Sequence, residues 1–265
     1  MPGPLFNPPQ DEAELFSRID LSCGNPGLVS PVLTMGDEFQ IFTTIRYDLQ
    51  LKQIPKDASL EHVGWNYIHA SPLYMLDFHR DRLLKAARYW RWQPAVELLS
   101  SEDALAYLET LVLDHLGSDT TGPTRVKILV SSRGHATIQS GSTKSKTLGN
   151  LFPRYLPPPG DTHNSPTFTL LLDHVKTAPS AFTNYKTTSR LMYDTARGRA
   201  GIELGDQKEV LVVNEDNGQI MEGTVFTPYF WRDGGWVTPP IPTEFSPGTG
   251  SGGHDGTTRR WALER

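Results

Sequence analysis

The chain has 265 residues, of which 37% are hydrophobic, so it can bury a substantial core in one large domain or two modest ones. Its net charge of −5 is spread along the sequence without a basic block, which argues against nucleic acid as a main partner. No apolar run approaches the roughly twenty residues that cross a membrane, and the start of the chain has neither a basic end nor an apolar run. We therefore expect a cytoplasmic protein without a secretory or transit signal.

Cysteine and histidine usage gives no sign of a metal site. The single cysteine, Cys23, excludes an internal disulfide, and its simplest role is that of a small buried hydrophobic residue. His79, His135 and His254 lie far apart along the sequence, and no metal-ligand spacing joins them. We assign no metal ligands.

The first half of the chain is predicted to form one strand and two helices before a second strand. Alternation and β-branched residues predict the first strand at 38–47. Asp77 is a plausible N-cap for the helix that follows it, and the next helix is expected to begin at Ser100 or Ser101 and to end at Gly117. The remaining expected segments are a disordered lead at 1–10, a helix start at 11–16, a turn-rich loop at 26–31 and a buried strand at 126–130.

A proline-rich segment interrupts the periodicity in the middle of the chain. Four of the eight residues from 153 to 160 are prolines, which makes this segment a stiff connector. We place an interdomain linker at 154–165, between a small N-terminal domain at 1–153 and a larger domain at 166–265.

The second half is predicted to alternate strands with helices. An apolar strand at 167–175 precedes the segment around Lys186, which leads into a helix. Asp216-Asn217-Gly218 is a strong signal for a hairpin turn between strands at 209–213 and 219–224. Further expected segments are a hairpin at 230–240, a glycine-rich stretch at 248–256 and a helix start at 257–264.

Four features of the sequence share one chemical explanation, an aldehyde cofactor with a phosphate group and a pyridine ring. Partial burial of a lysine lowers the pKa of its ammonium group and yields the neutral amine that forms an imine with an aldehyde, a role that suits Lys186. A carboxylate such as Glu222 can keep a pyridine nitrogen protonated. A cation such as Arg82 can pair with the phosphate, together with the N–H groups where a helix begins at Gly256-Thr257-Thr258. Taken singly, Arg82 and Glu222 would more simply be solvated surface residues.

Segments that match a known family run in that family's order over nearly the whole chain after residue 35. They are Phe42 to Arg46, His79 to Leu83, Val126 to Gly134, Lys186 to Leu191, Glu209 to Glu222, Phe230 to Pro240, and Gly256 to Arg259. With these segments the sequence resembles the fold-type-IV pyridoxal-phosphate enzymes, which include branched-chain and D-amino-acid aminotransferases and aminodeoxychorismate lyase. The resemblance implies an α+β (α/β) fold with a small N-terminal α/β domain and a larger, β-barrel-like C-terminal α/β domain. It also implies a homodimer in which both subunits contribute residues near each pocket.

The resemblance implies a role for each matching position. Lys186 would form the imine with pyridoxal 5′-phosphate and move the proton, and Glu222 would pair with the pyridine nitrogen. The phosphate would be bound by Arg82, Thr258 and the backbone of Gly256 and Thr257. The substrate pocket would be lined by Phe42, Thr44 and Arg46.

Within this family, Phe42-Thr43-Thr44 looks most like aminodeoxychorismate lyase, whereas transaminases more often place Glu-Gly or Glu-Thr after the phenylalanine. The strand that ends in Ser132-Arg133-Gly134 also fits the lyase. We therefore expect conversion of 4-amino-4-deoxychorismate into p-aminobenzoate and pyruvate, a step of folate biosynthesis, with Thr44 holding the substrate or relaying a proton. Two alternatives stay open: an aminotransferase acting on an amino acid, branched-chain or D-, or a small amine, and an interaction protein that has kept the scaffold and lost the chemistry.

The sequence departs from the family pattern in three ways. Ser189 stands where many members have asparagine. No second arginine for the substrate carboxylate follows Arg133-Gly134, which leaves Arg46, Lys144 and Lys146 as candidates. The sequence ends at Arg265, where relatives usually continue the last helix and add strands, so we expect either a shortened chain or a core completed differently, such as by the partner subunit.

Overall fold

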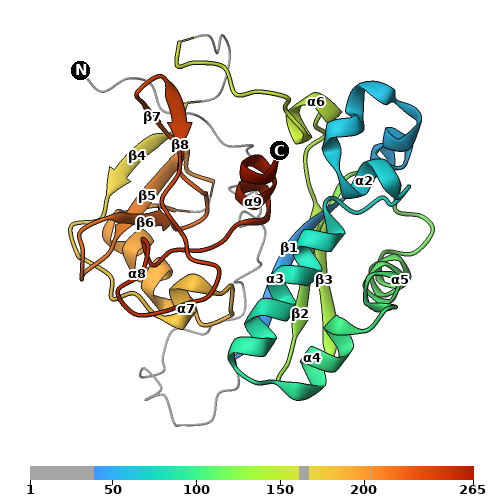
Figure 1. Ribbon diagram of the computed structural model, residues 1–265, viewed down its shortest axis with the longest axis horizontal. Coiled ribbons are helices and arrows are strands. Elements are labelled where there is room, and N and C mark those ends of the chain that lie inside the picture. The colour runs from blue at the N-terminus through green and yellow to red at the C-terminus, as the bar shows by residue number, and fades with distance from the viewer. Residues whose placement is uncertain (1–38, 161–166, 204) are drawn as a thin grey trace.

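The computed structural model of the chain describes residues 39–160, 167–203 and 205–265. Its two three-stranded sheets lie on opposite sides of the molecule, each with its own helices (Figure 1). The disordered lead at 1–10, the helix start at 11–16, the loop at 26–31 and Cys23 were predicted for a part of the chain outside the described residues. Among the described helices, none is long and apolar enough to cross a membrane.

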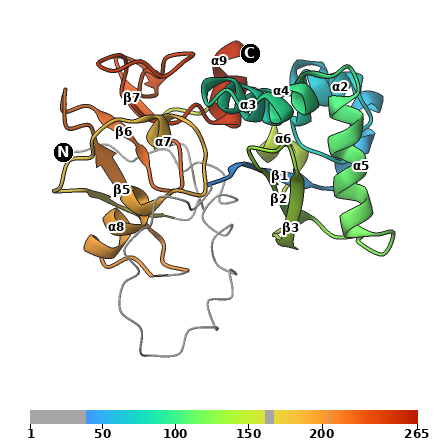
Figure 2. The ribbon, with the colours of Figure 1, turned by 90° about the horizontal axis from the view of Figure 1, so that it is seen from below.

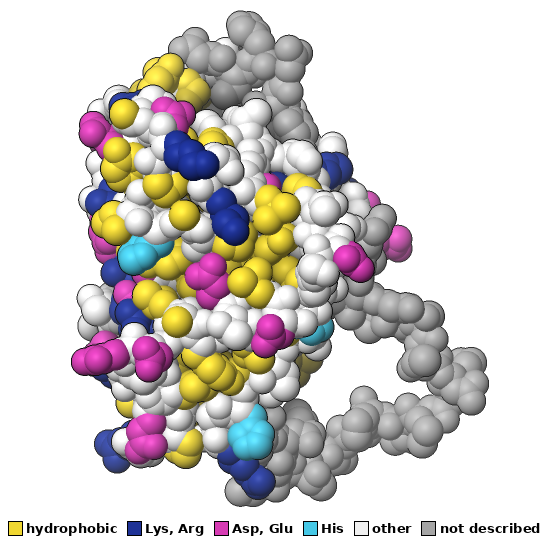
Figure 3. Space-filling model, turned by 90° about the vertical axis from the view of Figure 1, so that its right-hand side faces the viewer, with side chains coloured by type: hydrophobic (Ala, Val, Ile, Leu, Met, Phe, Trp, Pro, Cys, Tyr) yellow, Lys and Arg dark blue, Asp and Glu magenta, His cyan; other side chains and the backbone are white. Residues whose placement is uncertain are grey.

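The first sheet is antiparallel with the strand order β1-β2-β3, and three helices pack against it (Figure 2). These elements are β1 (Ile41–Tyr47), α3 (Leu76–Tyr89), α4 (Gln93–Ser100), α5 (Ala104–Leu116), β2 (Thr124–Val130) and β3 (Ala136–Ser142). Alternate residues of the strands, such as Ile45 and Ile128, join Leu83 and Leu108 of the helices in one core. The predicted strands at 38–47 and 126–130 are therefore confirmed in their described parts. On the side that α5 forms, acidic and basic side chains are mixed among apolar ones (Figure 3).

Two predicted helix starts are wrong. Asp77 is not an N-cap but lies in the first turn of α3, because the preceding Met75 adopts a left-handed backbone with φ 53° and donates its N–H to Asn66 Oδ1. A helix does not begin at Ser100 or Ser101 either. Ser100 is the last residue of α4, a helix that we did not predict and that has a proline near its start. The next helix, α5, begins at Ala104. The predicted end of α5 at Gly117 is confirmed, since this glycine takes up φ +70° as the C-cap.

Short elements that periodicity did not predict lie between and beside the longer ones. They are the 3-10 helices η1 (Leu49–Lys56) and η2 (Ala58–Val63), and the one-turn helices α2 (Trp65–Ile68) and α6 (Leu148–Leu151). Together with α3 they form a second core around Tyr74, Phe78 and Phe152. Trp261, from the far end of the chain, packs into the same core, so the last helix is anchored beside α3.

The second sheet has the order β4-β5-β6, with β4 parallel and β6 antiparallel to β5. The elements of this half are β4 (Thr169–Leu172), α7 (Ala181–Asn184), α8 (Leu191–Arg199), β5 (Lys208–Val213), β6 (Ile220–Gly223), β7 (Phe230–Arg232), β8 (Gly235–Val237) and α9 (Thr257–Glu264). The hairpin turn at 216–218 is confirmed, with Gly218 at φ +70°, and so is the hairpin at 230–240. The strand predicted at 167–175 is shorter than expected.

The segment that contains Lys186 joins the two halves of the structure. Phe42 N donates to Lys186 O at 3.0 Å, and Thr188 N donates to Gln40 O at 2.9 Å. An antiparallel bridge between Ile41 and Thr187 lies between these bonds. Residues 186 to 188 therefore pair along β1, which places the candidate lysine beside the strand that was predicted to face the substrate.

Candidate active site

Lys186 is partly buried and lies between α7 and α8. Its Nζ is 5.4 Å from the centroid of the Phe42 ring, across the pairing with β1. On its other side, Thr183 Oγ1 donates to Gly252 O at 2.6 Å and Asn184 Nδ2 donates to Gly253 O at 3.1 Å. The glycine-rich segment that leads to α9 is thus fastened to the helix that precedes the lysine.

Glu222 lies on β6 with 9% of its surface exposed. The alternative of a solvated surface carboxylate therefore does not fit this position. The hydroxyl of Tyr193, on α8, donates a hydrogen bond to Glu222 Oε1. Burial and the neighbouring Glu222 carboxylate raise the pKa of Tyr193 well above its usual value, so this hydroxyl keeps its proton. A fixed donor therefore orients the carboxylate.

His254 lies next to this pair, with its Nδ1 3.9 Å from Glu222 Oε1. Neither ring nitrogen has a hydrogen-bond partner among the described residues, although both are buried. Burial lowers the pKa of His254 well below its usual value, and the cations Lys186 and Arg82 lower it further. The imidazole is therefore neutral, and it lies beside the Glu222 carboxylate.

The buried neutral state of His254 predicts a loss of stability on acidification. Below about pH 6.5 the imidazole of the unfolded chain takes up a proton that the folded one does not. The free energy of unfolding therefore decreases as the pH is lowered, by about 1.4 kcal/mol per pH unit for one such group. In His254→Asn the free energy of unfolding should depend less steeply on pH than in the wild type, by up to about 1.4 kcal/mol per pH unit between pH 6.5 and pH 5, measured by chemical denaturation. His135→Asn, at an exposed position, is the matched control and should keep the wild-type dependence. An unchanged slope in His254→Asn would contradict a neutral buried imidazole.

Arg82 projects from α3 toward β1, where its Nη2 donates to Thr43 Oγ1. Thr43 Oγ1 is also 2.6 Å from His79 Nδ1. Burial, followed by Arg82 and Lys186, lowers the pKa of His79 well below its usual value. A neutral His79 can accept the Thr43 proton while the Thr43 oxygen accepts from Arg82, so the arginine is positioned by a directed chain of hydrogen bonds. The alternative of a solvated helix arginine does not fit this partly buried position.

The first turn of α9 lies close to Arg82. Arg260 of α9 is 2.8 Å from Asp81 of α3, which fastens the two helices to each other. Gly256 is the N-cap and makes no side-chain cap, so the first N–H groups of α9 are not satisfied by a capping side chain. Arg82 and Thr257 line the same small cavity. A helix N-terminus beside an arginine is suited to hold a phosphate group.

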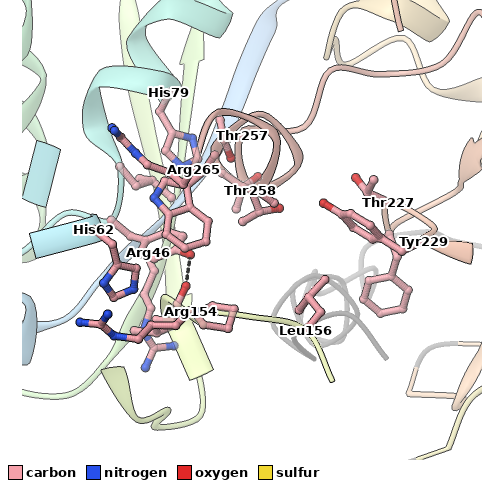
Figure 4. Close-up of a pocket in the computed structure, with 18 of the residues that line it drawn as sticks. Arg46, His62, His79, Arg154, Leu156, Thr227, Tyr229, Thr257, Thr258 and Arg265 are labelled. Carbon is pink, nitrogen blue, oxygen red and sulfur yellow. Dashed lines mark hydrogen bonds between the residues drawn. The ribbon is translucent and has the colours of Figure 1, made fainter. Parts of the chain in front are cut away.

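A cavity of about 360 Å³ lies beside these groups. Figure 4 shows Arg46 and His79 on one side of it and Thr227 and Tyr229 on the other, with Thr257 and Thr258 between them. Thr44 of β1 also lines it. The predicted positions Thr44, Arg46, Thr257 and Thr258 are thus brought together, whereas Phe42, Arg82, Lys186, Glu222 and Gly256 are not among its lining residues.

The structure distinguishes the candidates for binding a substrate carboxylate. Arg46 lines the cavity, but its Nε and Nη2 donate to Asp48 Oδ2 at 3.0 and 2.7 Å, so its charge is paired inside the protein. Lys144 and Lys146 are absent from the cavity lining. Sequence reasoning did not single out Arg125, which lines the cavity opposite Arg46 in the β1–β2 register.

Glu209, which was predicted only as part of a strand, organises the turn after Glu222. Its carboxylate accepts hydrogen bonds from the backbone N–H groups of Thr224, Val225 and Phe226 and from the Thr224 hydroxyl. The turn also needs glycine at Gly223, where a Cβ would lie 2.8 Å from Phe226 O. The carboxylate therefore fixes the backbone that carries Glu222.

Loss of the Glu209 charge should weaken the fold. Glu209→Gln leaves buried N–H groups without a strong acceptor and removes the carboxylate 3.9 Å from Arg197. We expect the free energy of unfolding to fall by about 2–4 kcal/mol, measured by urea denaturation. Glu203→Gln, at an exposed position a few residues earlier, should change it by less than about 0.5 kcal/mol. Equal stability of the two variants would show that the turn does not depend on Glu209.

The side chains described above fit pyridoxal phosphate. That cofactor requires an amine, a carboxylate for its ring nitrogen, and a cation with backbone N–H groups for its phosphate. Lys186 and Arg82 both lower the pKa of the buried imidazole of His254, whose Nδ1 lies 3.9 Å from Glu222 Oε1, so the charges of the amine and the cation are felt beside the carboxylate. The two unpartnered nitrogens of that imidazole also indicate a place built for polar contacts that the protein alone does not make.

Comparison with known proteins agrees with this assignment. The family model described as amino-transferase class IV matches residues 63–265. One similar solved structure is a Mesorhizobium loti protein assigned as an amino-acid aminotransferase. It has 21% sequence identity and a TM-score of 0.51, and the match covers 86% of this chain and 83% of that one. Another, from Thermotoga maritima and assigned as a branched-chain amino acid aminotransferase, has 17% identity and a TM-score of 0.51, with 85% of this chain and 62% of that one covered. At these identities the likeness shows the fold alone. No curated protein matches the chain.

The family model covers well over half of the sequence, including Lys186, Glu222 and the start of α9. The two-sheet α+β architecture of the structure agrees with it. The chain therefore belongs to the class IV aminotransferase family, whose enzymes depend on pyridoxal phosphate.

Proposed function

We propose that the protein is a lyase that converts 4-amino-4-deoxychorismate into p-aminobenzoate and pyruvate with pyridoxal phosphate. The observation that carries this proposal is the position of Thr44, whose side chain lines the 360 Å³ cavity on the strand that pairs with Lys186. A hydroxyl at this place can hold the substrate or relay a proton. Aromatic side chains of the lining, Tyr74, Tyr229 and Trp261, offer apolar contact to a ring-shaped substrate.

In this proposal the groups around His254 hold the cofactor. Arg82, Thr258 and the backbone N–H group of Thr257 would bind its phosphate, whereas the Gly256 N–H already donates to His254 O at 3.0 Å. Glu222, held by the Tyr193 hydroxyl, would pair with the ring nitrogen. When bound, pyridoxal phosphate supplies an aldehyde that links to the substrate amine and a ring that withdraws electrons from it.

Lys186 moves the proton in the proposed reaction. Nζ of Lys186 would take the proton from the substrate ring carbon that bears the amino nitrogen. The enolpyruvyl group then leaves as the substrate ring becomes aromatic, and protonation of that group gives pyruvate. Thr44 lies on the cavity side of β1, where it can donate to a substrate oxygen.

The second candidate function is an aminotransferase acting on a branched-chain or D-amino acid or a small amine. It is favoured by the description of the matching family model as amino-transferase class IV. In that reaction Lys186 moves the substrate α-proton, and a keto acid must accept the amino group. A dependence on keto acid therefore separates the two functions.

The test is product formation without a keto acid. Cofactor-loaded protein is mixed with 4-amino-4-deoxychorismate, and p-aminobenzoate is followed by its fluorescence. The proposal predicts a steady rise of the product. No product from cofactor-loaded protein, together with amino transfer when an amino acid and a keto acid are supplied, would establish the second candidate instead.

The proposal includes the organisation expected from the family. It comprises two domains at 1–153 and 166–265 with a linker at 154–165, a homodimer and a cytoplasmic location. Light scattering of the cofactor-loaded protein should give twice the 29.6 kDa mass of the chain.

A further inference from the structure

One face of the first sheet carries an unusual number of cations. In the β1–β2 register, Thr44 is opposite Lys127 and Arg46 is opposite Arg125. These residues alternate with Ile45, Val126 and Ile128, which point into the core on the other side of the sheet. The face that carries Thr44, Arg46, Arg125 and Lys127 is called the cavity face below, because three of these residues line the 360 Å³ cavity.

The cavity face has more positive than negative charge. Arg46 is paired with Asp48 at 2.7 Å. Within the described ranges, no Asp or Glu lies within 4 Å of the cationic groups of Arg125 or Lys127, and the Lys127 ammonium instead lies 4.3 Å from the centroid of the Phe42 ring. Like charges directly opposite each other on neighbouring strands destabilise a sheet. Burial lowers the pKa of Arg125, and burial, Arg190 and Arg125 lower that of Lys127, so the charged form of both side chains is disfavoured at these positions.

We infer that Arg125 is the residue that binds a carboxylate of the substrate, with Lys127 as the neighbouring second charge. Arg125 lines the cavity, is partly buried and has no carboxylate partner of its own among the described residues, in contrast to Arg46. Its planar guanidinium can donate two parallel hydrogen bonds to a carboxylate. A substrate with two carboxylates would neutralise both cations, and this part of the inference rests on the proposed function.

The inference is tested by binding of chorismate, which has both carboxylates of the proposed substrate and a hydroxyl in place of its amine. Because it lacks the amine, binding is measured without turnover, by calorimetry on the cofactor-loaded protein. Arg125→Gln should weaken binding roughly 10- to 100-fold, the effect of losing hydrogen bonds to a charged group. Arg125→Lys should lose less, because it keeps the charge but not the paired donors. Arg88→Gln, at an exposed position on α3, removes one positive charge elsewhere and should bind like the wild type.

A second readout separates substrate recognition from a structural role. Arg125→Gln should raise KM for 4-amino-4-deoxychorismate by a similar factor while kcat changes by less than about threefold, and the cofactor should bind with unchanged affinity in a spectroscopic titration. Equal chorismate affinity of the wild type and Arg125→Gln would overturn the inference. So would a fall in kcat and cofactor affinity with KM unchanged.

Failure of the proposed function gives a different result. If the wild type forms no p-aminobenzoate from 4-amino-4-deoxychorismate, the lyase function is contradicted, and the same arginine is then tested with 2-oxoglutarate as amino acceptor. A KM for 2-oxoglutarate that rises at least about tenfold in Arg125→Gln supports the carboxylate site. An unchanged KM overturns it.

Discussion

Replacing Lys186 with alanine should abolish both turnover and the long-wavelength absorbance of the cofactor-loaded protein. Lys186 is the amine on the segment that pairs along β1, and in the proposed reaction its Nζ takes the proton from the substrate. A positioned proton-transfer group contributes about 10²–10⁴-fold to a rate, and loss of the covalent link to the cofactor adds to this. We expect turnover to fall at least about 1,000-fold, measured by product fluorescence, with the absorbance maximum returning to that of free cofactor.

The matched control for this experiment is Lys176→Ala. Lys176 lies ten positions earlier at an exposed site, so its removal should leave turnover and absorbance unchanged. Circular dichroism of both variants checks that the fold is kept. Persistence of the absorbance shift or of turnover in Lys186→Ala would contradict the role of this lysine.

Replacing Glu222 with glutamine should reduce kcat about 100- to 1,000-fold, the range measured when one preorganised electrostatic partner of a transition state is removed. The glutamine oxygen can still accept the Tyr193 hydrogen bond, so the side chain keeps its place and only its charge is lost. Without the carboxylate the ring nitrogen is not held protonated, and the ring withdraws electrons less strongly. The measurement is kcat at saturating substrate, with cofactor content determined in the same sample.

Two further variants serve as comparisons for the fall in kcat of Glu222→Gln. Glu222→Asp keeps the charge but shortens the side chain, so it should retain more activity than Glu222→Gln. Glu215→Gln replaces an exposed glutamate in the turn before β6 and should behave as the wild type. A kcat of Glu222→Gln within threefold of the wild type would show that Glu222 does not face the ring nitrogen.

Local chemistry made part of the fold predictable from sequence. Alternating β-branched residues identified β1, and Asp216-Asn217-Gly218 identified a turn whose backbone requires φ > 0. Asp77 was misassigned because the start of α3 is fixed by the bond from Met75 N–H to Asn66, which lies nine residues earlier in α2. Helix α4 was missed because its eight residues are too short for periodicity to stand out.

The candidate site was predictable only as a set of separate residues. Lys186 and Glu222 could be predicted from the chemistry of the cofactor and from the order of the segments that match the family. Their orientation depends on Tyr193 and His254, which reach Glu222 only because α8, β6 and the glycine-rich segment meet in space. The role of Arg125 depends likewise on strand register and on the ion pair that occupies Arg46. A single sequence contains no signal for such contacts.

The most direct test of the central claim is to find where the cofactor is attached. Cofactor-loaded protein is reduced with borohydride, digested with trypsin and mapped by mass spectrometry. We predict the phosphopyridoxyl group on Lys186, within a peptide from residue 177 to residue 190 that is left uncut at the modified lysine. Attachment to another lysine, or no attachment at all in protein that has been incubated with pyridoxal phosphate, would contradict the site described here.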